Sequence, residues 1–179
     1  MSSIEIREAT EADRERIERL LRDSWGSTTV VSRGRVYDAA RLPALVAIGT
    51  DEALHGLVTL CPDGADCELV SLDALTRRGG VGSALIAAAV EWARARGCRR
   101  LWLITTNDNL DAIRFYQRRG WRLVAVHPGG ADRARELKPS IPEVGEYEIP
   151  IHDELEFELL VDPPAPAPHS GRRLTDPGG

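Results

Sequence analysis

The sequence predicts a mixed α/β fold in which helices flank one central sheet of about six or seven strands. Three observations support this fold class. Short alternating or apolar runs, typical of strands, recur along the chain. Two longer segments, 81–96 and 109–119, carry apolar residues at helical spacing, and a glycine follows each. Between them, Leu101–Ile104 is a continuous apolar run, as expected of a central strand buried on both faces.

The remaining elements follow the same patterns. Strands are expected over residues 4–6, 45–48, 54–60, 68–75, 101–105, 121–126 and 154–160. A first helix is expected to begin after Thr10 and to run to about Ser24. The stretch 26–41 is predicted to form a short helix or a loop, and 127–150 a long structured loop with one helical turn over 132–138.

The connections complete the predicted topology. The crossover from 68–75 through a helix to 101–105 predicts a parallel strand pair. One domain is expected over residues 1–160. Residues 161–179 are rich in proline, have little to bury and are expected to be a disordered tail.

Composition excludes several classes of protein. The chain has 179 residues and a formal net charge of -5, so nucleic acid is not an expected partner. The longest apolar stretch, Leu85–Val90, is too short to span a bilayer, and the first residues do not resemble a secretion signal. The histidines and cysteines lack metal-ligand spacing, so no metal is expected. We therefore expect a cytoplasmic protein without a membrane partner.

A glycine-rich turn, Arg77-Arg78-Gly79-Gly80-Val81-Gly82, joins a predicted strand to a predicted helix. The first N–H groups of a helix lack intrahelical partners and carry partial positive charge, so such a turn favours an anion. The turn lacks both the Gly-x-Gly-x-x-Gly pattern and the Lys-Ser/Thr ending of a P-loop. A dinucleotide or nucleoside triphosphate is therefore not the expected ligand.

A second motif changes the meaning of the first. Asn109-x-x-Ala112-x-x-Phe115-Tyr116, followed by Gly120-Trp121, resembles the Asn-x-x-Ala-x-x-Phe-Tyr-x-x-x-Gly-aromatic signature of the GCN5-related N-acetyltransferase (GNAT) superfamily. Arg77-x-x-Gly80-x-Gly82 resembles the pyrophosphate loop of that family, with an additional glycine at position 79. The two motifs occur in the family's order, separated by a helix and a strand, and the resemblance covers about residues 4–160.

The resemblance implies acetyl-CoA as the co-substrate, between splayed central parallel strands of a mostly antiparallel sheet. The cofactor arm is implied to pair with the main chain of Leu72, Asp73 and Ala74. The pyrophosphate is implied to bind near Arg77 and on the amides of Arg78, Gly79, Gly80, Val81, Gly82 and Ser83. Asn109 and Ala112 belong to the same cofactor-binding set, and Tyr116 is implied to face the thioester sulfur.

The chemistry of acetyl transfer to an amine fits two side chains. Removing the proton from an alkylammonium group at pH 7 costs roughly 4 kcal/mol of free energy, so a carboxylate that accepts this proton would assist the reaction. Glu68 is the candidate base because its strand position resembles that of the family base, and the alternation predicts that it shares a strand face with Val70 and Leu72. An exposed glutamate at a strand edge is the alternative, and Asp73 and His127 are rival bases. Tyr116 is the candidate acid for the leaving thiolate, and a core tyrosine is its alternative.

The acceptor is not specified by the resemblance. We expect an N-acetyltransferase acting by direct attack in a ternary complex, on an amine of a small molecule rather than of a protein. Basic and aromatic residues of 26–42 and 127–150 are expected to wall the acceptor groove and favour an anionic acceptor, or else to be solvated, namely Arg33, Arg35, Tyr37, Arg133, Arg135 and Lys138. The run Asp153–Glu158 is expected to be a strand with a solvated acidic face. A CoA-binding regulatory module, acetylation of a protein lysine or N-terminus, and a homodimer remain open.

Overall fold

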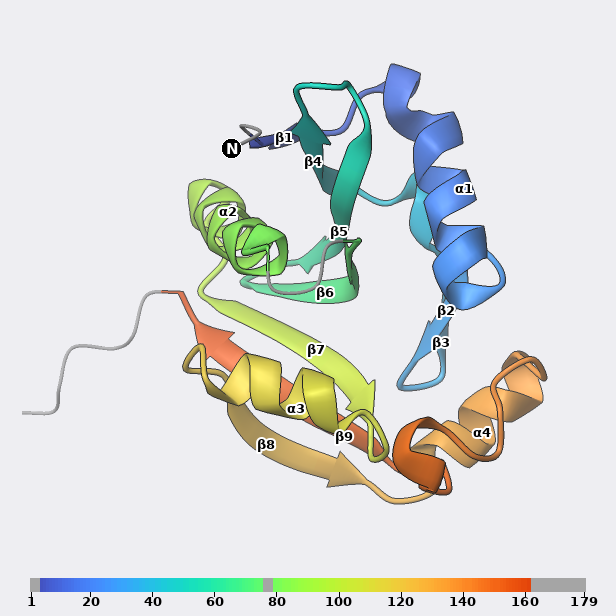
Figure 1. The fold of residues 1–179 in the computed structure, drawn as a ribbon. Coiled ribbons are helices and arrows are strands. Elements are labelled where there is room, and N and C mark those ends of the chain that lie inside the picture. The colour runs from blue at the N-terminus through green and yellow to red at the C-terminus, as the bar shows by residue number, and fades with distance from the viewer. Residues whose placement is uncertain (1–3, 76–78, 162–179) are drawn as a thin grey trace, which may run out of the picture.

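The elements build a seven-stranded mixed sheet with helices on both faces (Figure 1). The computed structural model describes residues 4–75 and 79–161. The strands are β1 (Ile4–Glu8), β2 (Thr29–Ser32), β3 (Arg35–Asp38), β4 (Ala44–Gly49), β5 (Leu54–Asp63), β6 (Asp66–Ala74), β7 (Arg100–Thr106), β8 (Arg122–His127) and β9 (Glu154–Leu160). The helices are α1 (Arg14–Trp25), α2 (Val81–Ala95), α3 (Leu110–Gln117) and α4 (Gly130–Leu137), with short 3-10 turns η1 (Glu11–Asp13), η2 (Ala39–Arg41) and η3 (Glu146–Glu148).

The sheet order is β1-β4-β5-β6-β7-β9-β8. Every pairing is antiparallel except β6 with β7, which α2 connects. The predicted fold class is therefore confirmed, including the mostly antiparallel sheet and its central parallel pair. In Figure 1 the strands β1, β4, β5 and β6 form one half, and β7, β9 and β8 form the other.

Hydrophobic side chains form one cluster on each face of the sheet. The cluster on the side of α2 and α3 includes Leu85, Leu101 and Phe157, all fully buried. The cluster under α1 includes Leu21 and Val46, together with residues of the β2–β3 hairpin. Because both faces are covered, the central strands are apolar on both sides, as the run in β7 predicts.

The segment 26–41 differs from its prediction. Instead of a short helix or loop, it contains the β2–β3 hairpin, followed by η2. Its two-residue turn is formed by Arg33 and Gly34, with φ angles of 48° and 75°. Paired positive φ angles are typical of the tight turns whose twist matches that of the strands. The β-branched run before the turn was the available signal, but each strand has only four residues.

The N-terminal end of the first helical segment is fixed by a buried carboxylate. Asp13 is 3% exposed and accepts the Thr10 N–H at 2.8 Å, while two guanidinium nitrogens of Arg7 donate to it at 2.7 and 2.9 Å. The predicted cap at Thr10 is therefore present, and an ion pair from β1 reinforces it. These hydrogen bonds, above all those from Arg7, hold the pKa of Asp13 well below its usual range.

The other end of the described chain is also packed. Val161 is 4% exposed and its N–H donates to the carbonyl oxygen of Arg99 at 2.9 Å. The packed structure thus continues at least one residue past β9. The predicted tail from 162 onward lies outside the described residues. Across 4–75 and 79–161, none of the helices has the length and apolar character needed to cross a membrane.

Candidate active site

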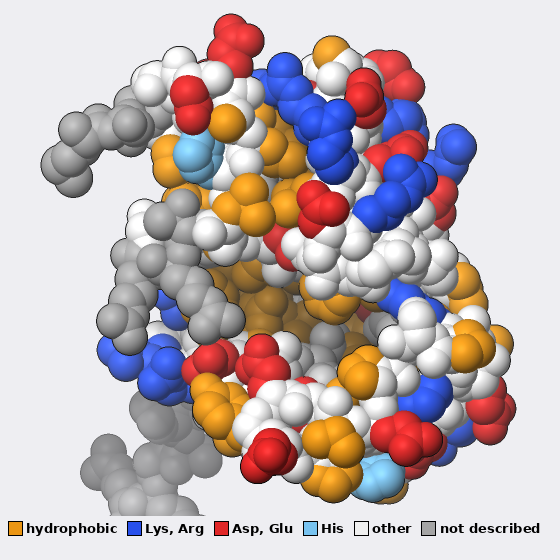
Figure 2. Space-filling model, turned by 45° about the vertical axis from the view of Figure 1, so that its right-hand side comes forward, with side chains coloured by type: hydrophobic (Ala, Val, Ile, Leu, Met, Phe, Trp, Pro, Cys, Tyr) orange, Lys and Arg blue, Asp and Glu red, His pale blue; other side chains and the backbone are white. Residues whose placement is uncertain are grey.

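The central sheet opens where β6 and β7 part. Their parallel pairing is confined to Asp66–Glu68 against Arg100–Trp102, and the two strands lie apart beyond it (Figure 1). The surface is hollowed between the two halves of the molecule, with hydrophobic side chains at the bottom of the hollow (Figure 2). The predicted splay between these strands therefore exists, and it leaves the main chain of β6 beyond Glu68 without β7 as a neighbour.

A bulge in β6 lies beside this opening. Thr59 of β5 pairs with Ser71, whereas Leu60 pairs with Leu69, so Val70 is the extra residue. An extra residue in one strand interrupts the ladder and reverses the alternation of side chains that follow. Residues before and after the bulge therefore occupy the two faces of the sheet in opposite order.

The bulge corrects one prediction from strand alternation. Leu72 does not share a face with Glu68, since it packs against the cluster under α2. Asp73 faces α1 instead, where the indole Nε1 of Trp25 donates to its two carboxylate oxygens at 3.0 and 3.2 Å. Burial raises the pKa of Asp73, and the hydrogen bond from Trp25 opposes this rise. The carboxylate proposed as a rival base is thus engaged with α1.

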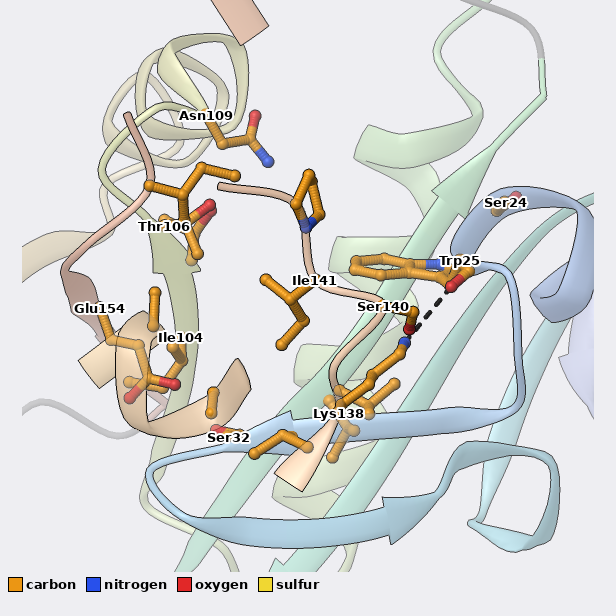
Figure 3. Close-up of a pocket in the computed structure, with 18 of the residues that line it drawn as sticks. Ser24, Trp25, Ser32, Ile104, Thr106, Asn109, Lys138, Ser140, Ile141 and Glu154 are labelled. Atoms are coloured by element: carbon orange, nitrogen blue, oxygen red, sulfur yellow. Dashed lines mark hydrogen bonds between the residues drawn. The ribbon is translucent and has the colours of Figure 1, made fainter. Parts of the chain in front are cut away.

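The hollow contains a cavity of about 330 Å³, which we call the inner cavity (Figure 3). Parts of α1, β2, β6, β7, α4 and the segment after α4 form its wall. Most of its wall is apolar, and two carboxylates face it. The lining residues include Trp25, Val30, Ser32, Glu68, Val70, Ile104, Thr106, Asn109, Ala131, Lys138, Ile141, Ile151 and Glu154.

Glu68 is buried in this wall, with 2% of its surface exposed. The hydroxyl of Tyr37 donates a hydrogen bond to its Oε2 at 2.6 Å, while Oε1 has no hydrogen-bond partner among the described residues. Burial raises the pKa of Glu68, and the nearby hydroxyls of Ser32 and Tyr37 act against this. The predicted alternative of an exposed edge glutamate is wrong, because β6 is an internal strand.

Tyr116 lies in the core on the other face of the sheet. Its ring contacts those of Phe115, Trp121 and Phe157, at centroid distances of 5.2, 5.3 and 6.4 Å. Burial raises the pKa of its hydroxyl, and the negative charge of Asp73 adds to this rise. The phenol therefore stays protonated at neutral pH, as a proton donor requires. Tyr116 is not among the residues that line the inner cavity.

The glycine-rich turn begins α2. Arg77 and Arg78 lie outside the described residues. Gly80 is the N-cap, with a φ of 78°, a left-handed conformation that favours glycine. Val81 points into the core and is 2% exposed, so it has only its main-chain N–H to offer a ligand. Gly82 is buried against Phe115. Because it has no side chain, it does not obstruct the main chain of the first turn of α2.

A second cavity, which we call the outer cleft, lies at this helix start and measures about 950 Å³. Basic side chains from α3 and the residues after it face the glycines across it. It is lined by Ala74, Gly80, Gly82, Ser83, Asn109, Asp111, Arg114, Phe115, Arg118, Arg119, Glu146 and Tyr147. A cleft with helix N–H groups on one side and guanidinium groups on the other suits an anionic ligand.

Arg119 lines the outer cleft and is a residue that the sequence analysis did not single out. Its guanidinium bonds to the Ser83 hydroxyl through Nε at 3.1 Å and also through Nη2, and it stacks 3.6 Å from the ring centroid of Phe115. Its position therefore ties the end of α3 to the start of α2. The repeated arginines at helical spacing, Arg114, Arg118 and Arg119, were the available signal.

Asn109 lines both the inner cavity and the outer cleft. It is the N-cap of α3, and its side-chain oxygen accepts the N–H of Ala112 at 3.1 Å. This cap occupies the oxygen, so a ligand has the amide Nδ2 to contact. Ala112 itself is partly buried against the core under α2. The motif thus fixes the helix start at the junction between the two cavities.

The acidic strand differs from its prediction. Glu154 and Glu156 of β9 are 3% and 6% exposed, so the acidic face is not solvated. Glu156 accepts hydrogen bonds from Arg100 at 2.6 Å and pairs with His127 at 3.0 Å. Arg33 also pairs with it, at 3.4 Å. His127 is thereby engaged outside the inner cavity, which does not favour it as a base.

The basic residues that were expected to wall the acceptor groove also differ from their prediction. Arg135 donates to the carbonyl oxygens of Ile141 and Pro142, and Lys138 donates to those of Trp25 and Thr29. Of the predicted basic side chains, Lys138 lines the inner cavity, whereas the arginines do not. The basic residues mainly fix loops, and carboxylates face the cavity. The expectation of an anionic acceptor is therefore not supported.

The motifs, the opening between β6 and β7 and the two cavities define an acetyl-transfer fold. Residues 9–121 match the acetyltransferase (GNAT) family. The chain belongs to this family and is an acetyl-CoA-dependent acetyltransferase. The resemblance carried by the two sequence motifs is therefore confirmed.

Particular relatives extend the comparison. The uncharacterised protein YdhI of Bacillus subtilis is 40% identical over 138 residues, which are 77% of this chain and 86% of YdhI. A streptothricin acetyltransferase of Streptomyces lavendulae is 38% identical over 80 residues, 42% of each chain. A GNAT acetyltransferase from Elizabethkingia anophelis, solved with acetyl-CoA bound, shares the fold with a TM-score of 0.61 and 17% identity, over 88% of this chain and 97% of that one.

Proposed function

We propose that the protein transfers the acetyl group of acetyl-CoA to an amine of a small molecule, by direct attack in a ternary complex. The observation that carries this is the position of Glu68. Its carboxylate is buried in the wall of a mostly apolar cavity, and one of its oxygens is unpaired. That cavity and the outer cleft share Asn109, so an acceptor and a donor have adjoining sites.

The outer cleft is the proposed site of the CoA phosphates. The free N–H groups at the start of α2, from Gly80 to Ser83, and the guanidinium of Arg119 supply donors and positive charge there. The cofactor arm would run along the main chain of Leu72, Asp73 and Ala74, and Ala74 lines the cleft. The opening beside β6 leaves these main-chain groups free of β7.

Glu68 is the proposed base. It takes a proton from the acceptor ammonium through its free oxygen, and the neutral nitrogen then forms a bond to the acetyl carbon. A buried carboxylate with a raised pKa is better matched to an amine than an exposed one, since a general base is most efficient with a pKa near the working pH. General-base catalysis of this kind contributes about 10² to 10⁴ in rate.

Tyr116 is the proposed acid. As the bond between the acetyl carbon and sulfur breaks, its hydroxyl gives a proton to the sulfur; the nitrogen loses its second proton to solvent as the amide forms, and solvent returns one proton to the phenolate. Its protonated hydroxyl and its position on α3, the helix whose N-cap Asn109 lines both cavities, support this role. The alternative, a core tyrosine without a catalytic role, predicts no loss of rate when the hydroxyl is removed.

A small acceptor is favoured over a protein. The segment 130–151 forms one wall of the inner cavity, and a site of about 330 Å³ suits a metabolite-sized molecule. The name of the relative from Streptomyces lavendulae, streptothricin acetyltransferase, also points to a small molecule. A protein lysine would need an open groove instead.

A panel of amines assayed for release of free CoA thiol tests the proposal. We expect turnover with small primary amines and little with lysine-containing peptides. Calorimetric titration with acetyl-CoA, run in parallel, distinguishes an enzyme from a protein that binds CoA without catalysing acetyl transfer. Tight binding without thiol release from any amine would indicate a CoA-binding regulatory module.

A further inference from the structure

Glu154 is a second buried carboxylate in the inner cavity, and the proposed acetyl transfer does not use it. It begins β9, is 3% exposed and lines the cavity (Figure 3). The start of α4 is built around it, since a Cβ on Gly130 would lie 2.9 Å from the Cβ, Cγ and Oε2 of Glu154. Glycine at position 130 therefore makes room for this side chain.

The immediate neighbours of Glu154 compensate its charge poorly. Within the described part of the chain it accepts a single hydrogen bond, a long one of 3.4 Å from the N–H of Arg33. Among the described residues, no basic side chain forms an ion pair with it, although it also lines a second hollow with His127, Arg133 and Arg33, whose positive charge acts on it through space. Burial raises its pKa in spite of those charges. A buried carboxylate in such surroundings is stabilised when a cation binds beside it.

The lysine of the cavity does not fill this role. The ammonium group of Lys138 donates to the carbonyl oxygens of Thr29 and Trp25, at 2.8 and 3.3 Å. In Figure 3 Lys138 and Glu154 lie on different sides of the cavity. The carboxylate of Glu154 is therefore left for a ligand.

Two further polar atoms in the same wall lack partners. The hydroxyl oxygen of Ser32 and Oε1 of Glu68 are buried, and neither forms a hydrogen bond of normal geometry among residues 4–75 and 79–161, although the Ser32 hydroxyl lies close enough to Glu68 to oppose the rise of its pKa. Ser32 ends β2, next to Arg33, whose N–H approaches Glu154. Buried polar atoms without partners are uncommon, and in a cavity they indicate a polar ligand.

The strand register separates the two carboxylates. Glu68 lies opposite Trp102 on β7, and Glu154 lies opposite Thr106, four residues further along. With two strand spacings between β6 and β9, the two Cα positions are about 16 Å apart. Both side chains reach into the cavity between them, so their carboxylates are closer than this. A ligand with a polar group at each end of a chain several bonds long would reach both carboxylates.

We propose that the acceptor is an aliphatic diamine or a longer amine of that kind. One amino group reacts at Glu68, near the hydroxyl of Ser32, while a second, still protonated, pairs with Glu154. The apolar wall between them, including Val70 and Ile104, would contact the methylene chain. This proposal rests on the proposed amine acetylation and specifies the class of acceptor.

The test compares a homologous series of α,ω-diaminoalkanes with primary monoamines of the same chain length. We expect kcat/KM to be higher for diamines, with an optimum at one chain length. Glu154→Gln should lower kcat/KM for the best diamine about 10- to 100-fold, the range for loss of a charged hydrogen bond, and change that for the monoamine about twofold or less. Glu143→Gln, the same change of charge at an exposed residue that does not line the inner cavity, should have no effect.

A third variant separates recognition from packing. Glu154→Asp shortens the side chain by one methylene, so the preferred diamine should become longer, which a merely structural role would not produce. Equal kcat/KM for diamines and monoamines in the unaltered protein would overturn the diamine proposal and leave amine acetylation intact. An equal loss for both substrates in Glu154→Gln would also overturn it. Absence of thiol release with every amine would instead contradict the proposed function.

Discussion

The hydroxyl of Tyr37 donates a hydrogen bond of 2.6 Å to Oε2 of Glu68, and both side chains are buried. Tyr37 belongs to β3, in the small hairpin outside the main sheet, whereas Glu68 belongs to β6. The hairpin therefore fixes one oxygen of the proposed base and leaves the other free for the acceptor. Because the hydrogen bond favours the charged carboxylate, it also influences when Glu68 can accept a proton.

Replacing Tyr37→Phe should shift the pH dependence of the reaction. Loss of a donor to the carboxylate raises the pKa of Glu68 further, and the base acts only when deprotonated. The acidic limb of kcat/KM should therefore move to higher pH, by about one to two pH units, since a hydrogen bond to a charged group is worth about 1.5 to 3 kcal/mol. Val36→Ala, an exposed change on the same hairpin, should leave the profile in place. An unchanged acidic limb in Tyr37→Phe would show that the hydrogen bond does not tune Glu68.

Replacing Tyr116→Phe should lower kcat about 10²-fold or more, because the thiolate then leaves without a proton donor. Acetyl-CoA affinity and the midpoint of thermal unfolding should change little, since the ring and its contacts with Trp121 and Phe157 remain. Steady-state kinetics across pH, with calorimetry as the control, measures this. If kcat is the same across pH, Tyr116 is a core residue and not the acid.

Replacing Gly82→Asp should weaken acetyl-CoA binding by about tenfold or more. The new carboxylate would face the phosphates at the start of α2, and like charges brought together cost several kcal/mol. Ala84→Asp is the matched control, because position 84 is exposed on the same helix turn and does not line the outer cleft. Titration calorimetry of both variants gives the comparison. Equal affinities would mean that the phosphates bind elsewhere.

Replacing Asp13→Asn should lower the free energy of unfolding at neutral pH by about 1 to 3 kcal/mol, through loss of the cap and of the pair with Arg7. The pKa of Asp13 is lowered in the folded state, so its contribution is present above the unfolded pKa of about 3.9 and is lost as pH falls. The difference from the unaltered protein should therefore narrow below about pH 4. Urea unfolding at several pH values measures it, with exposed Asp23→Asn as the control. A difference that is constant with pH would contradict this account.

The sequence alone determined the order of the strands of the main sheet along the chain and the class of enzyme, but not the β2–β3 hairpin. Helix and strand periodicity, such as the alternation in β9 and the apolar run in β7, depends on residues close in the chain. The two motifs around Gly82 and Tyr116 are also short, because each is built within one turn and one helix. Their spacing was sufficient to indicate a GNAT fold with acetyl-CoA as donor.

Only the tertiary structure decided which side chains share a cavity. The Tyr37 hydrogen bond to Glu68, the burial of Glu154 and the engagement of Asp73 by Trp25 join segments far apart in the sequence. Strand register, the bulge at Val70 and the packing of α4 set these contacts, and none of them leaves a periodic pattern. The alternating pattern of a strand is the same whether a glutamate in it points to solvent or into a cavity. The role of that glutamate therefore depends on which elements the fold packs against its side of the sheet.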